Sequence, residues 1–116
     1  MTQVTLYHNP RCSKSREALA LLEAQGIQPK VVLYLETPSK PKELESLLKQ
    51  LGLKPKDVMR TKEPVYRELK LAQSQLTDKQ LIQILADNPI LIERPIVVCK
   101  QKAVIARPPE KLLEII

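Results

Sequence analysis

Cys12 stands among basic and hydroxyl side chains, a setting in which a thiol ionises readily and can act as a nucleophile. The surrounding loop reads His8-Asn9-Pro10-Arg11-Cys12-Ser13-Lys14-Ser15-Arg16. Its cations, and the unpaired N–H groups of a helix that follows, would favour a thiolate. A lone cysteine is more commonly buried and inert, but arginine, serine and lysine neighbours are unusual at a core position. We therefore expect Cys12 to be a reactive cysteine.

The elements on either side of this loop predict an α/β fold. Residues 3–7 and 31–35 are apolar runs typical of strands, and residues 13–25 have the spacing of an amphipathic helix that stops at Gly26. A strand, a helix and a strand form a βαβ unit, so the two strands should be parallel. The uninterrupted apolar run at 31–35 predicts a strand covered on both faces.

The middle of the chain, about residues 38–88, is expected to be a helical insertion. Leucines recur at helical spacing between residues 41 and 51. Thr77 and Gln80 have the spacing of a capping box at the start of a second long helix. Shorter helices or turns are expected in two further segments, 54–60 and 64–71.

The C-terminal part predicts a β-hairpin followed by a helix. The apolar runs 96–99 and 103–106 are the expected strands, although the turn between them lacks the usual Gly or Asn. A last helix is expected from 108 to 116. The order β-α-β, helical insertion, β-β-α predicts a single domain over residues 1–116, with one mixed sheet flanked by helices. This is the layout of a thioredoxin-like fold.

Composition restricts the partners and the compartment. The formal net charge of +6 suggests an anionic partner, but we expect no nucleic-acid binding because the Lys and Arg residues are spread out without aromatic neighbours. Two cysteines and one histidine are too few for a disulfide scaffold or a Cys/His zinc site, so no metal is expected. No segment resembles a signal peptide or a membrane span. We expect a cytoplasmic protein without membrane association, in which Cys99 is buried in a strand.

Three parts of the sequence together carry a resemblance to a known family. They are the Cys loop with Arg60, the segment Glu93-Arg94-Pro95-Ile96-Val97-Val98, and the segment Arg107-Pro108-Pro109-Glu110. In this combination they closely resemble the arsenate reductase family of ArsC type, the glutaredoxin-coupled class, over essentially the whole chain. The resemblance implies a thioredoxin-like fold with a helical insertion. It also implies reduction of arsenate to arsenite, with glutathione as co-substrate, glutaredoxin as partner and no bound cofactor.

The resemblance assigns roles to individual residues. Cys12 would attack arsenic and displace an oxygen as water. The positions that bind the oxyanion correspond to Arg60, Arg94 and Arg107, whose planar guanidinium groups suit a tetrahedral anion. The loop positions that assist the thiolate correspond to His8 and Ser15. The residues that shape the site correspond to Asn9, Pro10 and Pro95, the last with a cis peptide bond.

Other interpretations of these residues remain open. Arg60, taken alone, is better explained as a surface residue, whereas Arg94 and Arg107 each precede a proline beside an apolar strand. His8 could act on Cys12 through its charge, or could simply hydrogen-bond the loop. Ser15 could be no more than a first-turn helix residue. The spacing from Cys12 to Ser15 is C-x-x-S, so the loop cannot form an internal disulfide and a second thiol must come from outside.

Two other functions fit the same fold. One is that of an Spx-type transcription regulator, which binds RNA polymerase; its redox switch generally uses a C-x-x-C pair that is absent here. The other is that of a monothiol glutaredoxin-like enzyme, which handles glutathione adducts and needs no oxyanion-binding arginines. We expect the protein to be a monomer.

Overall fold

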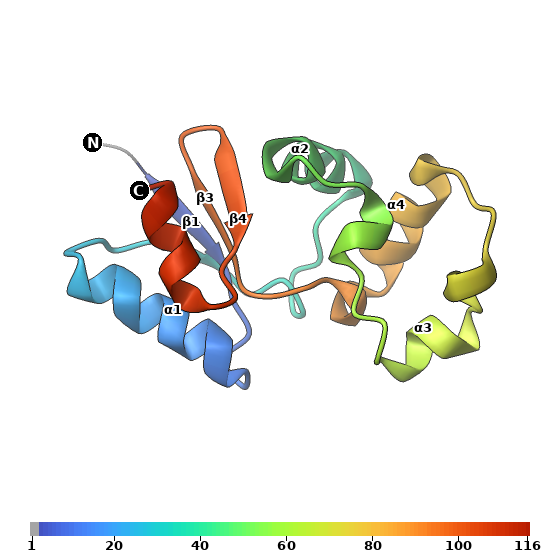
Figure 1. Ribbon diagram of the computed structural model, residues 1–116, viewed down its shortest axis with the longest axis horizontal. Coiled ribbons are helices and arrows are strands. Elements are labelled where there is room, and N and C mark those ends of the chain that lie inside the picture. The colour runs from blue at the N-terminus through green and yellow to red at the C-terminus, as the bar shows by residue number, and fades with distance from the viewer. Residues whose placement is uncertain (1–2) are drawn as a thin grey trace. The chain divides into compact units, whose positions relative to one another are not determined.

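The computed structural model describes residues 3–116, which fall into two compact units (Figure 1). The first unit joins the N-terminal segment through Thr37 to the segment Arg94–Ile116, and the second is Pro38–Glu93. The second unit starts where the helical insertion is expected to start, and it extends beyond the expected end at residue 88. The Cys12 loop belongs to the first unit.

Within the described residues, the first unit contains a four-stranded sheet of order β2-β1-β3-β4. The strands are β1 (Val4–Tyr7), β2 (Lys30–Val32), β3 (Ile96–Cys99) and β4 (Lys102–Ile105). β1 pairs in parallel with β2 and antiparallel with β3, and β3 and β4 form an antiparallel hairpin. This mixed sheet confirms the predicted α/β, thioredoxin-like fold class.

Two helices pack side by side against one face of this sheet, α1 (Ser13–Ala24) and the 3-10 helix η4 (Pro109–Glu114) (Figure 1). Alternate residues of a strand point to the same face, so Leu6 of β1 and Val97 of β3 share this face with their paired neighbours. The core also takes a leucine from each helix, Leu22 and Leu112. Because α1 is packed along this core, its N-terminal turn and the Cys loop are held at one end of the sheet.

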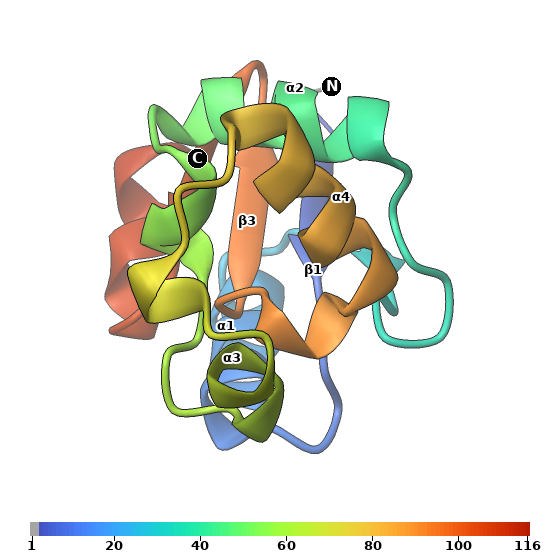
Figure 2. The same ribbon diagram turned by 90° about the vertical axis from the view of Figure 1, so that its right-hand side faces the viewer.

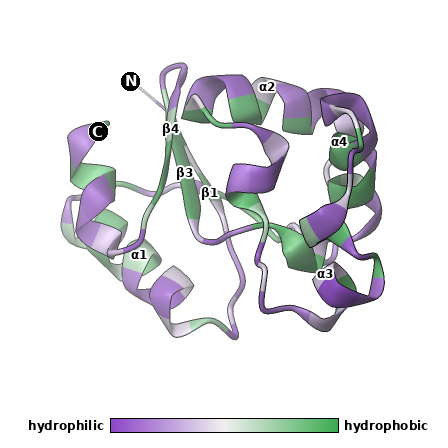
Figure 3. Cartoon of the chain, turned by 45° about the vertical axis from the view of Figure 1, so that its right-hand side comes forward, coloured by the Kyte–Doolittle hydropathy of each residue, from purple (hydrophilic) through white to green (hydrophobic). Residues whose placement is uncertain are grey.

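The second unit is helical. Its elements are α2 (Pro41–Leu51), η1 (Pro55–Val58), α3 (Pro64–Glu68), η2 (Leu71–Gln73), α4 (Asp78–Asp87) and η3 (Pro89–Leu91). α2 and α4 lie against each other (Figure 2). The hydropathy colouring in Figure 3 shows both helices with hydrophobic and hydrophilic stretches, as expected of amphipathic helices.

Two of the local signals in this unit work as expected. The Thr77 hydroxyl accepts the Gln80 N–H at 3.2 Å, and the Gln80 side chain accepts the Thr77 N–H at 2.9 Å, which confirms the capping box. Gly52 ends α2 with a φ of 71°, in the left-handed region that glycine adopts at little cost. In the described part of the chain, none of the helices is long and apolar enough to cross a membrane.

The prediction for residues 31–35 is wrong in length and in burial. β2 ends at Val32, and the Glu36 N–H bonds to the Leu33 carbonyl at 2.9 Å in a turn. Val31 is 41% exposed. The physical reason is that β2 is an edge strand, which among residues 3–116 pairs with β1 alone, so an apolar β-branched run here does not indicate burial on both faces.

The C-terminal elements also differ from expectation in detail. β4 begins one residue early, and the hairpin turn is Lys100-Gln101, with Lys100 at a φ of 55°. A lysine thus takes the left-handed conformation that Gly or Asn usually supplies. The last helix is a 3-10 helix and covers only Pro109–Glu114. Cys99 is 3% exposed, which confirms its expected burial.

Candidate active site

Cys12 is the N-cap residue of α1. Its backbone is extended, with φ −95° and ψ 124°, and its carbonyl accepts the Arg16 N–H at 3.0 Å to begin the helix. Its own N–H bonds to the Asn9 carbonyl at 2.9 Å, which fixes the approach of the loop. The sulfur is half-buried and lies where the first turn of α1 presents its unpaired N–H groups.

The surroundings of Cys12 favour its thiolate. Burial raises the pKa of the thiol, but the backbone N–H of Ser15, the charge of Arg94 and the backbone N–H of Lys14 lower it by more. The net effect is a pKa below the ordinary value. Each of these groups stabilises the anion more than the neutral thiol. The thiolate is the form that attacks an electrophile.

The register of the sheet places the other site residues of the first unit at the same end. β1 ends at Tyr7, opposite the first residue of β3, Ile96, which in turn pairs with the last residue of β4, Ile105. His8, Arg94 and Arg107 therefore lie just beyond the strand ends, at the same end of the sheet. The Ala106 N–H bonds to the Pro95 carbonyl at 2.8 Å and holds the two arginine-bearing segments together.

At this end of the sheet, the Arg94 guanidinium lacks some of its hydrogen-bond partners. Its Nε and Nη1 atoms are buried and have no hydrogen-bond partner among the described residues. Buried donors without partners are rare, because each costs about 1–3 kcal/mol or more. The charge of Arg94 also acts on Cys12. Arg94 thus combines a positive charge that acts on Cys12 with two buried nitrogens that lack a hydrogen-bond partner among the described residues.

His8 and Ser15 form a buried hydrogen-bonded pair. His8 Nδ1 lies 2.6 Å from Ser15 Oγ, which also accepts the Asn9 N–H at 3.0 Å. The two side chains are 6% and 0% exposed. Burial, and next the charge of Arg16, lower the pKa of His8 from its ordinary 6.5. His8 is therefore neutral at pH 7, and its bond to Ser15 ties the end of β1 to the first turn of α1.

The loop has further internal supports. The Asn9 side-chain oxygen accepts the Arg11 N–H at 3.0 Å, and the Pro10 carbonyl accepts an N–H of the Arg16 side chain at 2.9 Å. The peptide bond between Arg94 and Pro95 is cis, as the resemblance implied, and that between Arg107 and Pro108 is also cis. Asn9 thus shapes the loop through its side-chain oxygen, and Pro10 through its backbone carbonyl.

Arg107 and Arg60 differ in what the structure shows of them. Arg107 follows β4 in the first unit and has an exposed side chain. Arg60 belongs to the second unit, where its N–H bonds to the Leu91 carbonyl at 2.7 Å and its Nη1 pairs with the Glu63 carboxylate. Glu63 was not among the residues singled out from the sequence. The three-residue spacing between Arg60 and Glu63 is the one feature of the sequence that could have predicted this ion pair.

Comparison with known proteins gives the family. The model described as ArsC family matches residues 7–115. The chain is 57% identical to "Uncharacterized protein YfgD" of Escherichia coli K12, covering 98% of this chain and 97% of that one. It is 48% identical to "Arsenate reductase" of Haemophilus influenzae, covering 97% and 98%. The solved structure "Arsenate reductase from Vibrio cholerae" superposes with a TM-score of 0.96 at 55% identity, covering 99% and 98%. This protein belongs to the ArsC family.

Proposed function

We propose that this protein is an arsenate reductase in which Cys12 is the nucleophile and Arg94 the principal oxyanion-binding residue. The observation that carries the proposal is the buried Arg94 guanidinium, with two idle donor atoms, next to a cysteine of lowered pKa. Arsenate is a tetrahedral oxyanion whose oxygens can accept paired N–H groups. The names of the relatives from Haemophilus influenzae and Vibrio cholerae support the same substrate.

The first chemical step is attack of the Cys12 thiolate on arsenic. A sulfur–arsenic bond forms and one oxygen, once protonated, leaves as water. Arg94 and Arg107 donate hydrogen bonds to the remaining oxygens and offset their negative charge. Arg60 is a third candidate for this role, on the resemblance to the family alone.

The second step needs an external thiol, because Ser15 occupies the place of a second loop cysteine and Cys99 is buried. Glutathione is the proposed co-substrate. The two electrons that convert As(V) to As(III) come from the Cys12 and glutathione sulfurs, which become joined as a disulfide. Glutaredoxin then takes up the glutathione and returns Cys12 to the thiol. No bound cofactor is needed for this balance.

His8 and Ser15 are proposed to position the nucleophile without exchanging protons with the substrate. Their hydrogen bond fixes the first turn of α1, whose N–H groups at Ser15 and Lys14 stabilise the thiolate. A neutral His8 adds no positive charge to the site at pH 7. Of the two interpretations that the sequence left open, the structural one is therefore favoured.

The idle donors of Arg94 also bear on the two rival functions. An enzyme that handles only glutathione adducts has no tetrahedral oxyanion to bind and no use for such a donor set. A C-x-x-C redox switch of the Spx type would need a cysteine at the position of Ser15. Neither rival accounts for an arginine held beside a thiolate with unsatisfied N–H groups.

A coupled assay tests the proposal. NADPH oxidation is followed in the presence of arsenate, glutathione, glutaredoxin and glutathione reductase, with the wild type, Cys12→Ser and Cys99→Ser compared. We expect arsenate-dependent oxidation with the wild type and with Cys99→Ser, and none with Cys12→Ser. An arsenate-independent rate, or a fully active Cys12→Ser variant, would contradict the assignment.

A further inference from the structure

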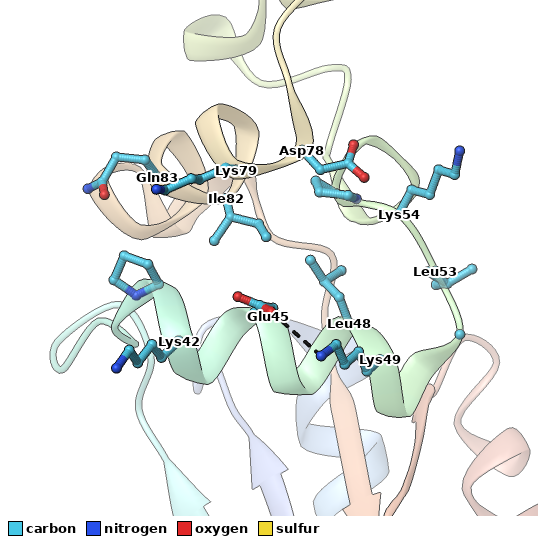
Figure 4. A pocket seen from close by; sticks show the side chains of 13 residues that line it. Lys42, Glu45, Leu48, Lys49, Leu53, Lys54, Asp78, Lys79, Ile82 and Gln83 are labelled. Carbon is cyan, nitrogen blue, oxygen red and sulfur yellow. Dashed lines mark ion pairs between the residues drawn. The ribbon is translucent and has the colours of Figure 1, made fainter.

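A groove in the second unit has no part in the chemistry described so far. It has a volume of about 780 Å³ and lies between α2 and α4, closed at one end by the segment that leads into η1. Figure 4 shows the Leu48 side chain of α2 and the Ile82 side chain of α4 pointing towards each other into this space. Leu53 and Pro55 also line the groove; Leu48 is 6% exposed and Leu53 36% exposed.

The rim of the groove is positively charged. Four lysines and two carboxylates line it: Lys42, Lys49, Lys54, Lys79, Glu45 and Asp78. Glu45 pairs with Lys49 at 3.6 Å, and Asp78 lies in the first turn of α4, where the helix dipole already favours a negative charge. Among the described residues, the other three lysines form no ion pair. The rim thus offers positive charge to whatever lies in the groove.

The dimensions of the groove match a helix. The groove is lined by α2 along most of its 11 residues and by the first half of α4, Asp78–Gln83, so its longer wall extends for roughly 15 Å at about 1.5 Å per residue. Three turns of a guest helix would fill that length. An amphipathic helix binds such a site by placing apolar residues spaced three and four apart on the floor.

We propose that this groove binds an amphipathic helix of an acidic partner protein. Its apolar side chains lie on Leu48, Leu53 and Ile82, and its Asp or Glu side chains face Lys42 and Lys79 across the groove. The proposal is independent of the arsenate chemistry, because none of the groove residues belongs to the candidate active site.

Charge and side-chain type argue against other occupants. A second copy of this chain would bring a net charge of +6 and its own lysine rim against the same surface, and like charges across an interface are unfavourable. Proteins bind single-stranded nucleic acid by stacking its bases on aromatic and arginine side chains. The described lining of the groove contains neither type of residue. An apolar floor between lysines fits an acidic helix better than a phosphate backbone.

The first test uses a synthetic peptide of 15 residues as the probe. Leucines spaced three and four apart form one face, glutamates flank them, and alanines fill the rest; the comparison peptides carry lysine for glutamate, or the same residues in scrambled order. Each is titrated into the full-length, nitrogen-15-labelled protein and followed by NMR. We expect saturable shifts at Leu48, Leu53 and Ile82, with the glutamate peptide binding at least about tenfold more tightly than either comparison peptide.

The second test changes the rim. Lys42→Glu combined with Lys79→Glu should weaken binding of the glutamate peptide by about tenfold or more. Lys100→Glu combined with Lys111→Glu changes the net charge equally in exposed positions of the first unit and should leave binding nearly unchanged. Circular dichroism establishes that both variants are folded.

Three results would overturn the proposal. One is equal affinity for the glutamate and lysine peptides, and another is equal weakening by the two pairs of substitutions. The third is a single-stranded DNA oligonucleotide that shifts the same NMR signals as tightly as the glutamate peptide does, which would make the groove a nucleic-acid site.

Discussion

Arg94 acts on Cys12 through its charge while two of its own nitrogens, Nε and Nη1, stay buried and without partners among the described residues. The guanidinium thus stabilises the thiolate, and two of its N–H-bearing nitrogens remain without a hydrogen-bond acceptor. A structural arginine would normally be satisfied by carboxylates or carbonyls. The arrangement has a clear use if an oxyanion arrives at the position where the thiolate attacks.

The first prediction concerns the acidity of Cys12. Its thiol should titrate below the value of about 8.5 for a free cysteine, because the first turn of α1 and Arg94 stabilise the anion. The rate of alkylation against pH, measured on the Cys99→Ser background, gives the inflection. Arg94→Ala should move the inflection upward. An inflection at or above the free value would show that burial dominates instead.

The second prediction concerns Arg94 and Arg107. Charge-assisted hydrogen bonds are worth about 1.5–3 kcal/mol, so Arg94→Ala should lower kcat/KM for arsenate by about ten- to a hundredfold. Arg94→Lys should recover only part of the loss, since it restores charge but not the planar fork. Arg107→Ala should act in the same direction. Inorganic phosphate should inhibit the wild type more than either variant.

Arg11→Ala is the matched control for this pair, because Arg11 is exposed and close in sequence to Cys12. It should stay near wild-type activity. The oxyanion-binding role would be refuted if Arg94→Ala and Arg107→Ala folded normally and reduced arsenate as well as Arg11→Ala does.

The third prediction concerns His8 and Ser15. Ser15→Ala leaves the buried His8 Nδ1 without its partner, so the free energy of unfolding should fall by about 1–3 kcal/mol. Ser13→Ala, at an exposed first-turn position, should cost much less. Urea denaturation of the two variants measures the difference. Equal losses would mean that the 2.6 Å contact with His8 does not stabilise the fold.

The pH dependence of stability follows from the lowered pKa of His8. Between the folded-state pKa and 6.5 the unfolded chain binds more protons than the native one, so stability rises with pH. The stabilisation is complete above 6.5 and is lost as pH falls through the lower, folded-state pKa. His8→Gln should flatten this part of the profile. His8→Gln should leave the pH of the Cys12 alkylation inflection almost unchanged. A clear upward shift of that pH would instead show that His8 acts on Cys12 through its charge.

The fourth prediction concerns Arg60, whose proposed role depends on the resemblance to the family. Arg60→Ala should lower kcat/KM for arsenate by about tenfold. Arg67→Ala, an exposed arginine of α3, is the control and should have no effect. A silent Arg60→Ala would reduce the proposed oxyanion site to Arg94, Arg107 and the N–H groups of α1, and would leave Arg60 as the partner of Glu63.

Elements with strong local signals could be predicted from the sequence. The capping box at Thr77, the glycine stop at Gly52 and the position of Cys12 before α1 each depend on residues close in sequence. The error at residues 31–35 arose because an apolar run does not reveal whether its strand lies at the edge of the sheet. That depends on pairing with β1, which is set by distant parts of the chain.

The same distinction holds in the candidate site. The reactive setting of Cys12 follows from its neighbours in the loop. The contact between His8 and Ser15 joins a strand end to a helix, and the sequence left its meaning open between charge and structure. The idle nitrogens of Arg94 could not be predicted, because a missing partner is a property of the packed structure. The groove between α2 and α4 likewise appears only when two helices that are distant in sequence are packed together.

The most direct test of the account is the separation and measurement of arsenite and arsenate after incubation with glutathione and glutaredoxin. We expect arsenite to accumulate at the same rate with the wild type and Cys99→Ser, and with Cys12→Ser only at the rate seen without protein. Arsenite formation by Cys12→Ser at the wild-type rate, or none above the protein-free rate with the wild type, would contradict it.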